Sequence, residues 1–147
     1  MWEHAALEIL VAPLTPRAIL PYKAHHTDAG FDLALPQDCQ VVPQQLSRLD
    51  LEFILQIPHG WYGQIFGRSS VFQRGLIVHP GVIDADYRGT VQLLVFNKTS
   101  ETQHLRRGER LAQLLVLPVP PVTLRCVTPT ELSPTPRGTG GFGSTGR

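Results

Sequence analysis

Apolar and polar residues alternate along short stretches of this chain, and proline or glycine residues separate one stretch from the next. The clearest stretch is residues 49–53, whose period of two is typical of a half-buried β-strand. A turn at residues 58–60 follows, and we expect residues 61–66 to return as the hairpin partner of this strand. Weaker forms of the same pattern predict further strands, at residues 7–12, 31–35, 39–42, 76–78, 91–96, 110–117 and 122–127.

These roughly ten short strands, separated by turn residues, predict an all-β fold, either a sandwich, a jelly roll or a barrel. The 13 prolines and 13 glycines interrupt every stretch that could form a long helix. Residues 69–73 are expected to form one short helical turn, capped by Ser69 or Ser70. Residues 97–107 are predicted to be a polar loop.

The carboxyl-terminal segment has a different composition. Three prolines between residues 129 and 136 form a stiff spacer, and residues 137–147 contain five glycines around a single phenylalanine, Phe142. Because so many glycines cannot hold a hydrophobic core, we expect a mobile arm. We therefore divide the chain into one β domain at residues 1–128 and a flexible arm at residues 129–147.

Composition narrows the class of protein. A chain of 147 residues with 42% hydrophobic and 17% charged residues has the values of a single globular domain. A net charge of +1 gives no field that would hold nucleic acid or an anionic membrane, so local groups must hold any bound anion. Cys39 and Cys126 form neither a disulfide framework nor a metal-binding spacing. We find no leader sequence or apolar span, and expect a soluble intracellular protein of the cytoplasm or nucleus that binds neither nucleic acid nor membranes.

The stretch from residue 75 to residue 97 carries the most informative chemistry. Two apolar strands flank a polar hairpin tip that contains Asp84 and Asp86. A carboxylate directly after the apolar pair Val82 and Ile83 costs free energy on burial unless it has a partner or a function. Both acids could instead cap their own turn, which is the commoner use of such residues. This stretch alone leaves open whether Asp84 is a turn residue or a general base beside a pocket.

Three other segments could bind an anion. Arg68, Ser69 and Ser70 combine a guanidinium, two hydroxyls and a helix amino terminus. Gln113 lies in an apolar run and must be hydrogen-bonded if it is buried. Asp32 is one of two acids at the start of a strand. Each segment, taken singly, also has a plain structural explanation: a helix cap with a surface arginine, a paired amide, and carboxylates that cap a turn.

The order of these segments is that of a known family. The chain resembles the trimeric dUTPases, the deoxyuridine triphosphate nucleotidohydrolases, which have five short motifs in fixed order. The matching segments are AGFDL at 29–33, GRSS at 67–70, GVIDADYRG at 81–89, RGERLAQ at 107–113 and RGTGGFGSTG at 137–146. The third and fifth motifs are highly specific, whereas the other three are weak singly. The segment GLIVHPGVIDADY is further similar to viral members of the family.

The resemblance implies a fold, an assembly and a reaction. Members fold as a β jelly roll with a flexible carboxyl-terminal arm and form a homotrimer whose three subunits contribute to each active site. The implied activity is that of a dUTP diphosphatase: water attacks the α-phosphorus of dUTP, and dUMP and pyrophosphate leave. This keeps uracil out of DNA and supplies dUMP for thymidylate synthesis. The implied cofactor is Mg²⁺, held by the substrate's phosphates and water rather than by protein ligands.

The resemblance also implies a role for the residues of the third motif. Asp84 would be the general base that orients and deprotonates the attacking water. The backbone of Gly81, Val82 and Ile83 would pair with the edge of uracil. Tyr87 would stack under the deoxyribose and leave no room for a 2′-hydroxyl group.

The remaining motifs would hold the phosphates and cover the base. Arg68, Ser69, Ser70 and Gln113 would hold the phosphates and the water, with Ser69 against the bridging oxygen. Asp32 would have a supporting role. In the arm, Arg137 would pair with a phosphate and Phe142 would lie over the uracil ring. The other arm residues implied to contact the nucleotide are Gly143, Ser144 and Thr145.

Two alternative functions can be compared with the sequence. Deoxycytidine triphosphate deaminase shares the fold, but it needs a glutamate ten residues after the hairpin aspartate, where this chain has Leu94. It also lacks the tyrosine found here at position 87. A non-catalytic dUTPase-like module for protein binding would have lost motif residues, and this chain keeps all of them. Release of pyrophosphate from dUTP would distinguish the enzyme from both alternatives.

Overall fold

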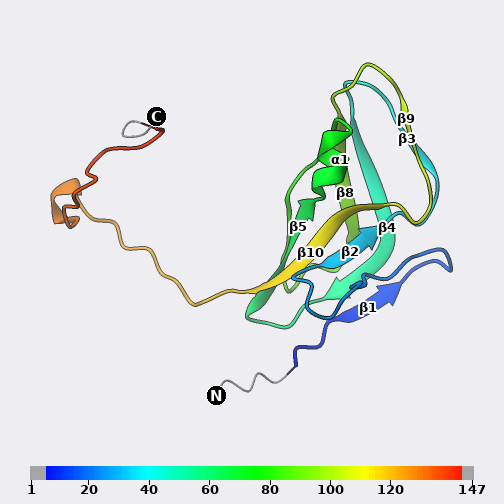
Figure 1. The fold of residues 1–147 in the computed structure, drawn as a ribbon. Helices are drawn as coiled ribbons and strands as arrows, with labels where there is room; N and C mark the ends of the chain where they lie inside the picture. Colours follow the sequence, from blue (N-terminus) through cyan, green and yellow to red (C-terminus); the bar gives the residue numbers. More distant parts are fainter. Residues whose placement is uncertain (1–5, 144–147) are drawn as a thin grey trace.

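A computed structural model of the protein describes residues 6–143 (Figure 1). This region contains ten strands, one short α-helix and one 3₁₀ turn. The strands are β1 (Leu10–Pro13), β2 (Phe31–Ala34), β3 (Cys39–Val41), β4 (Leu46–Gln56), β5 (Trp61–Gly67), β6 (Leu76–Val78), β7 (Gly81–Ile83), β8 (Thr90–Asn97), β9 (Gln103–Leu105) and β10 (Arg110–Pro118). The helix α1 covers Ser69–Gln73, and the 3₁₀ turn η1 covers Pro129–Glu131. The all-β class and the short helix are confirmed.

Two four-stranded sheets form a sandwich. One sheet has the strand order β1-β4-β8-β6 and the other has the order β2-β10-β5-β7, while β3 and β9 form a small separate pair. The side chains between the sheets form a single hydrophobic core with contributions from both, for example Phe53 of β4 and Leu114 of β10. In β8 every second residue is buried, as the period of two in its sequence requires.

One strand pairing differs from the hairpin expected from sequence, and a second hairpin contains an extra strand. The strand β5 does not pair with β4, because it belongs to the other sheet and bonds to β10 and β7. The predicted partnership of residues 49–53 with 61–66 is therefore wrong, and the turn at 58–60 carries the chain between the sheets. The pairing of β6 with β8 is as expected, but the chain between them first adds β7 to the opposite sheet. A period of two reports which face of a strand is buried, not which strand lies beside it.

Three local expectations are also corrected. Residues 122–127 form no strand, because this segment leaves the sandwich after β10 and exposes 73% of Val122 and 96% of Leu124 (Figure 1). The expected loop at 97–107 contains the strand β9. The helix α1 has Arg68 as its N-cap and no capping bond from a serine side chain.

The division of the chain into a domain and an arm at residue 128 remains a prediction. No helix within residues 6–143 is long and apolar enough to cross a membrane.

Asn97 carries the only fully buried side-chain amide within residues 6–143, and its amide nitrogen and oxygen both have hydrogen-bond partners. Its Nδ2 atom donates to the carbonyl oxygens of Val41 and Glu101, both at 2.9 Å. Its Oδ1 atom accepts from the backbone N–H of Thr99 at 2.9 Å and from its hydroxyl at 2.7 Å. Asn97 therefore joins β8 to β3 and to the turn before β9.

Replacing Asn97 with leucine should destabilise the fold by about 2–4 kcal/mol, because several buried backbone groups lose their partner. The measurement is the midpoint of urea unfolding at a fixed protein concentration. The control is Gln40→Leu, at the exposed position of β3, which should change stability by no more than about 0.5 kcal/mol. Equal midpoints for the two variants would show that the Asn97 bonds contribute nothing to stability.

Candidate active site

The residues of the third motif lie at one edge of the second sheet. The strand β7 pairs with β5 on one side only, with Ile83 opposite Gly63, and in the described part of the chain no strand covers its other side. The Ile83 side chain points into the core, whereas 62% of Val82 is exposed. The carbonyl oxygen of Gly81 accepts from Nε2 of Gln64 at 3.1 Å. Other backbone groups along the open side of β7 are available to a ligand.

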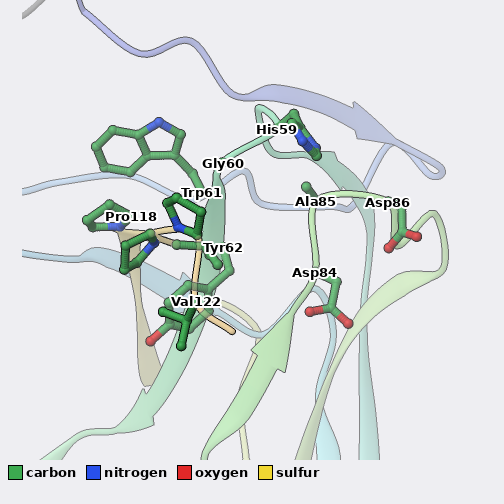
Figure 2. A pocket seen from close by; sticks show the side chains of 12 residues that line it. His59, Gly60, Trp61, Tyr62, Asp84, Ala85, Asp86, Pro118 and Val122 are labelled. Atoms are coloured by element: carbon green, nitrogen blue, oxygen red, sulfur yellow. The ribbon is translucent and has the colours of Figure 1, made fainter. Parts of the chain in front are cut away.

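Asp84 follows β7 directly and lies beside a cavity of about 1130 Å³. Figure 2 shows Asp84 and Asp86 on the loop at one side of this cavity, with Trp61 and Val122 on the other. Within residues 6–143, neither carboxylate accepts a hydrogen bond from the backbone, so the interpretation of both as turn-capping groups is wrong. The Asp84 carboxylate is exposed and free to contact water or a ligand.

Tyr87 folds back against its own loop. Its hydroxyl donates to the carbonyl oxygen of Thr90 at 2.8 Å. A Cβ atom on Gly89 would lie only 2.4 Å from the Tyr87 hydroxyl oxygen and 2.6–2.8 Å from two ring carbons, so only glycine leaves room for the ring. The side chain remains 42% exposed.

The second, fourth and first motifs meet on the same sheet because β10 lies between β2 and β5. Gln113 is opposite Asp32 on one side and opposite Phe66 on the other, and the chain continues from Phe66 through Gly67 into Arg68 and α1. Gln113 is half-buried, not enclosed as its apolar neighbours suggested, and its side chain makes no hydrogen bond within residues 6–143. Its amide is therefore available to a ligand.

A chain of contacts anchors Arg68. Its backbone N–H donates to the carbonyl oxygen of Leu111 at 3.1 Å, and its Nη1 atom donates to the carbonyl oxygen of Arg110 at 3.2 Å. The Arg110 guanidinium in turn forms an ion pair with Asp32 at 3.2 Å. Arg110 thus contacts Arg68 through its main chain and Asp32 through its side chain, so residues of three motifs meet here. Sequence reasoning missed Arg110, because nothing in its spacing indicates which acid it meets.

Within one subunit, Asp84 and Gln113 do not lie side by side. Asp84 follows the residue opposite Gly63, whereas Gln113 is opposite Phe66, so the two lie about four strand positions apart along β5. At about 3.3 Å per residue this is roughly 13 Å, and Ser69 and Ser70 lie farther along the same direction.

The fifth motif lies away from both Asp84 and Gln113. The arm runs outward from the sandwich (Figure 1), and its Phe142 side chain is fully exposed. Arg137 donates to the carbonyl oxygen of Gly140, and Gly143 has a positive φ of 79°. Ser144 and Thr145 lie outside the described residues.

Sequence reasoning missed several residues around Asp84. His59, Trp61 and Tyr62 line its cavity because the turn between β4 and β5 lies at the same end of the sandwich. Only the three-dimensional course of the chain reveals this.

The two cysteines, Cys39 and Cys126, do not line this cavity, and both are free thiols. Burial raises the pKa of the Cys39 thiol, with smaller contributions from the charges of Glu109 and Asp38, so this thiol is less reactive than an exposed one.

Comparison with known proteins identifies the family. The family model described as dUTPase matches residues 17–146. The chain belongs to the dUTPase family. The family membership expected from the five motifs is thus confirmed.

Both viral and bacterial relatives are similar over nearly their whole length. The deoxyuridine 5′-triphosphate nucleotidohydrolase of Fowlpox virus is 39% identical, over 95% of this chain and 97% of the viral one. The enzyme of the same name from Clostridium kluyveri is 36% identical, over 95% of this chain and 99% of the bacterial one. Among solved structures, the dUTPase of Staphylococcus bacteriophage 80alpha with dUPNHPP is 27% identical and superposes with a TM-score of 0.87, covering 95% of this chain and 99% of the phage chain. The dUTPase fold is confirmed by this match.

Proposed function

We propose that this protein is a dUTP diphosphatase, which cleaves dUTP into dUMP and pyrophosphate by attack of water on the α-phosphorus. The observation that carries the proposal is the Asp84 carboxylate, which lies exposed beside a cavity without a hydrogen-bond partner in residues 6–143. Such a carboxylate can take a proton from the attacking water. The names of the similar viral and bacterial proteins support the same reaction. Removal of dUTP would keep uracil out of DNA, and the product dUMP would supply thymidylate synthesis.

The nucleoside would bind along β7 (Gly81–Ile83). The open side of this strand supports pairing of its backbone groups with the edge of uracil, because hydrogen bonds to β5 occupy only the other side. Tyr87 would lie under the deoxyribose. Its ring is fixed against Gly89 and by its hydroxyl bond to Thr90, which supports a role in refusing the extra hydroxyl of ribose.

The phosphates would bind Arg68, Ser69, Ser70 and Gln113, with Ser69 against the bridging oxygen. Catalysis of phosphoryl transfer consists mainly of positioning and of stabilising developing charge, which a guanidinium, hydroxyls and an amide can supply. The hydrogen bond from Arg68 to the carbonyl oxygen of Arg110 supports this assignment, because an arginine held in place loses less entropy on binding a phosphate.

Mg²⁺ would reach the site with the substrate. No group of three or more histidine, cysteine or acidic residues within residues 6–143 could hold a metal ion, and Arg110 already occupies the Asp32 carboxylate. The groups around Gln113 therefore suit phosphate oxygens rather than a metal cage, and Mg²⁺ bound to the phosphates would neutralise part of their charge. The dUTPase of phage phi11 is described with a structural Mg(II) ion.

Each complete site would combine residues from different subunits of a homotrimer. Within one subunit, Asp84 and Gln113 lie roughly 13 Å apart along β5, and this separation of the third motif from the fourth supports contributions from two copies. The exposed apolar residues Val122 and Leu124, on a segment that leaves the sandwich, support an exchange of arms between copies. The arm would bring Arg137 to the phosphates and Phe142 over uracil, with Gly143, Ser144 and Thr145 beside them.

Measurement of pyrophosphate release from dUTP, UTP, dTTP and dCTP tests the function. We expect rapid release from dUTP and very slow release from UTP, because the fixed Tyr87 ring excludes the 2′-hydroxyl. Close packing of the base against the backbone of β7 should leave no room for the methyl group of thymine. Similar rates on UTP and dUTP would contradict the role of Tyr87, and no release from dUTP would contradict the proposed function as a whole.

A further inference from the structure

The loop at residues 84–89 joins the two sheets, and its own contacts are few and local. The backbone N–H of Tyr87 donates to the carbonyl oxygen of Asp84 at 3.1 Å, and Arg88 donates to the carbonyl oxygen of Ala85 at 2.8 Å. These bonds fix the shape of the loop. They do not fix its position relative to the strands, so another contact must hold Tyr87 in place.

That contact lies at the start of β8. The Tyr87 hydroxyl bonds to the carbonyl oxygen of Thr90, and the hydroxyl of Thr90 donates to Oδ2 of Asp50 at 2.8 Å. Gln92 donates to the same threonine hydroxyl at 3.2 Å. Two hydrogen bonds thus link Tyr87 through Thr90 to Asp50, which belongs to β4 and lies outside the family motifs quoted above.

Asp50 itself begins a β-bulge. Between Asp50 and Ile54 the register with β8 shifts, so that three residues of β4 stand opposite one residue of β8. The second oxygen of Asp50, Oδ1, accepts from the backbone N–H of Glu52 at 2.7 Å. One carboxylate thus joins the bulge to the start of β8.

An ion pair holds the bulge in its unusual conformation. Glu52 has a φ of 65°, which residues other than glycine rarely adopt, and only 8% of it is exposed. Arg17 donates to both of its carboxylate oxygens at 2.6–2.9 Å. The hydrogen bond and the charge of Glu52 raise the pKa of Arg17 above its ordinary value, so Arg17 remains charged.

We propose that Asp50 and Thr90 are positioning residues for Tyr87 and that they set how strictly the site distinguishes deoxyribose from ribose. The inference rests on the proposed function, which puts Tyr87 under the sugar. A ring can exclude one oxygen atom only if it cannot move aside by about the size of that atom. The bonds from the bulge through Asp50 and Thr90 supply this restraint, because the loop itself does not.

The test compares hydrolysis of dUTP and UTP by Thr90→Val, which removes the hydroxyl but keeps the carbonyl group that accepts from Tyr87. The ratio of kcat/KM for dUTP to that for UTP should fall at least about fivefold, as expected for one lost hydrogen bond. The fall should come mainly from a raised kcat/KM for UTP, because the loosened ring can move away from the 2′-hydroxyl, while kcat for dUTP should stay within about twofold. Thr90→Ser keeps the hydroxyl and should restore the ratio. Asp50→Ala should lower the ratio at least as much as Thr90→Val, because it also removes the bond from Glu52. The double variant should be little worse than Asp50→Ala, because the bond between Thr90 and Asp50 is already lost there.

A matched control separates positioning from a general loss of stability. Thr99→Val removes a threonine hydroxyl that bonds to Asn97 at 2.7 Å just beyond the opposite end of β8. This variant should leave the ratio of dUTP to UTP hydrolysis unchanged. If it lowers the ratio as much as Thr90→Val does, the effect is one of stability, and the proposal is overturned.

A second readout does not depend on hydrolysis. The protein has three tyrosines, so incorporation of 3-fluorotyrosine should give three ¹⁹F resonances, and Tyr87→Phe identifies that of Tyr87. In Thr90→Val this resonance should move towards that of the unfolded protein, while those of Tyr22 and Tyr62 and the whole spectrum of Thr90→Ser stay the same. In a protein that hydrolyses dUTP, the proposal is overturned if either the ratio or the resonance remains at its wild-type value. If the wild type does not hydrolyse dUTP, the proposed function fails, and the resonance alone decides whether Thr90 positions Tyr87.

Discussion

An Asp84→Asn protein should turn over saturating dUTP at least about 100-fold more slowly than wild type, the usual contribution of a general base. Asparagine keeps the shape of the side chain but cannot accept the proton of the attacking water. The Asp84 carboxylate has no hydrogen-bond partner within residues 6–143, so the substitution breaks no structural contact. Steady-state release of pyrophosphate measures the loss, while binding of the analogue dUPNHPP should change less than about threefold.

Asp86→Asn is the matched control, because Asp86 lies on the same loop, lines the same cavity and carries the same charge. It should keep turnover within a few-fold of wild type. The pair of variants separates a change in the charge of the cavity, which both share, from the loss of the base. Near-normal turnover in Asp84→Asn, or greater damage in Asp86→Asn, would show that the base is wrongly assigned.

Removal of residues 137–147 should abolish turnover and leave the oligomer intact. In the described region, no residue after Leu114 belongs to the buried apolar core, so the sandwich does not need the arm. The hydrogen bonds of residues 128–140 are local, as in the pairing of Thr128 with Glu131. Closure of the arm would exclude water and complete the charge around the phosphates, so its loss should affect kcat more than assembly. Light scattering and pyrophosphate release measure the two properties on one sample.

Mixing two inactive proteins tests whether the arm acts on another subunit. After subunit exchange, an Asp84→Asn chain and an arm-deleted chain should form some sites with an intact base and an intact arm. Activity should then reappear at a fraction of wild type set by the mixing ratio. Each protein mixed with itself is the control. If mixed oligomers form and remain as inactive as their parents, the arm does not serve a site that contains the base of another subunit.

The sequence predicted most strands but not their neighbours. The alternation of β8 is visible in the chain because each buried position falls two residues after the last, as for Val91, Leu93 and Val95. The separation of β4 from β5 into different sheets is not visible, since packing of the whole core decides it. Residues 122–127 show the limit most clearly. Their apolar residues resemble a strand, but a strand needs a partner, and the sandwich offers this segment none.

The candidate site was predicted residue by residue, but its supports were not. The motif order located Asp84, Tyr87 and Arg68, and the geometry around each is compatible with its expected role. Asp50, which is linked to the tyrosine, lies outside the motifs, and Arg110, which bonds to the arginine, lies within the fourth motif but had no predicted role. Such contacts depend on distances between strands far apart in sequence, which no local spacing encodes.

The position of Leu114 has a consequence for synthesis of the protein. Among the described residues it is the last member of the buried apolar core, so every group needed to close the sandwich has been added to the growing chain before the segment after Pro118 is made. Domains commonly fold as units. The sandwich of each subunit can therefore close before its last segment is placed, and exposed Val122 and Leu124 then meet surfaces that are already folded. Newly made chains would recognise one another as finished sandwiches, which limits entanglement between subunits.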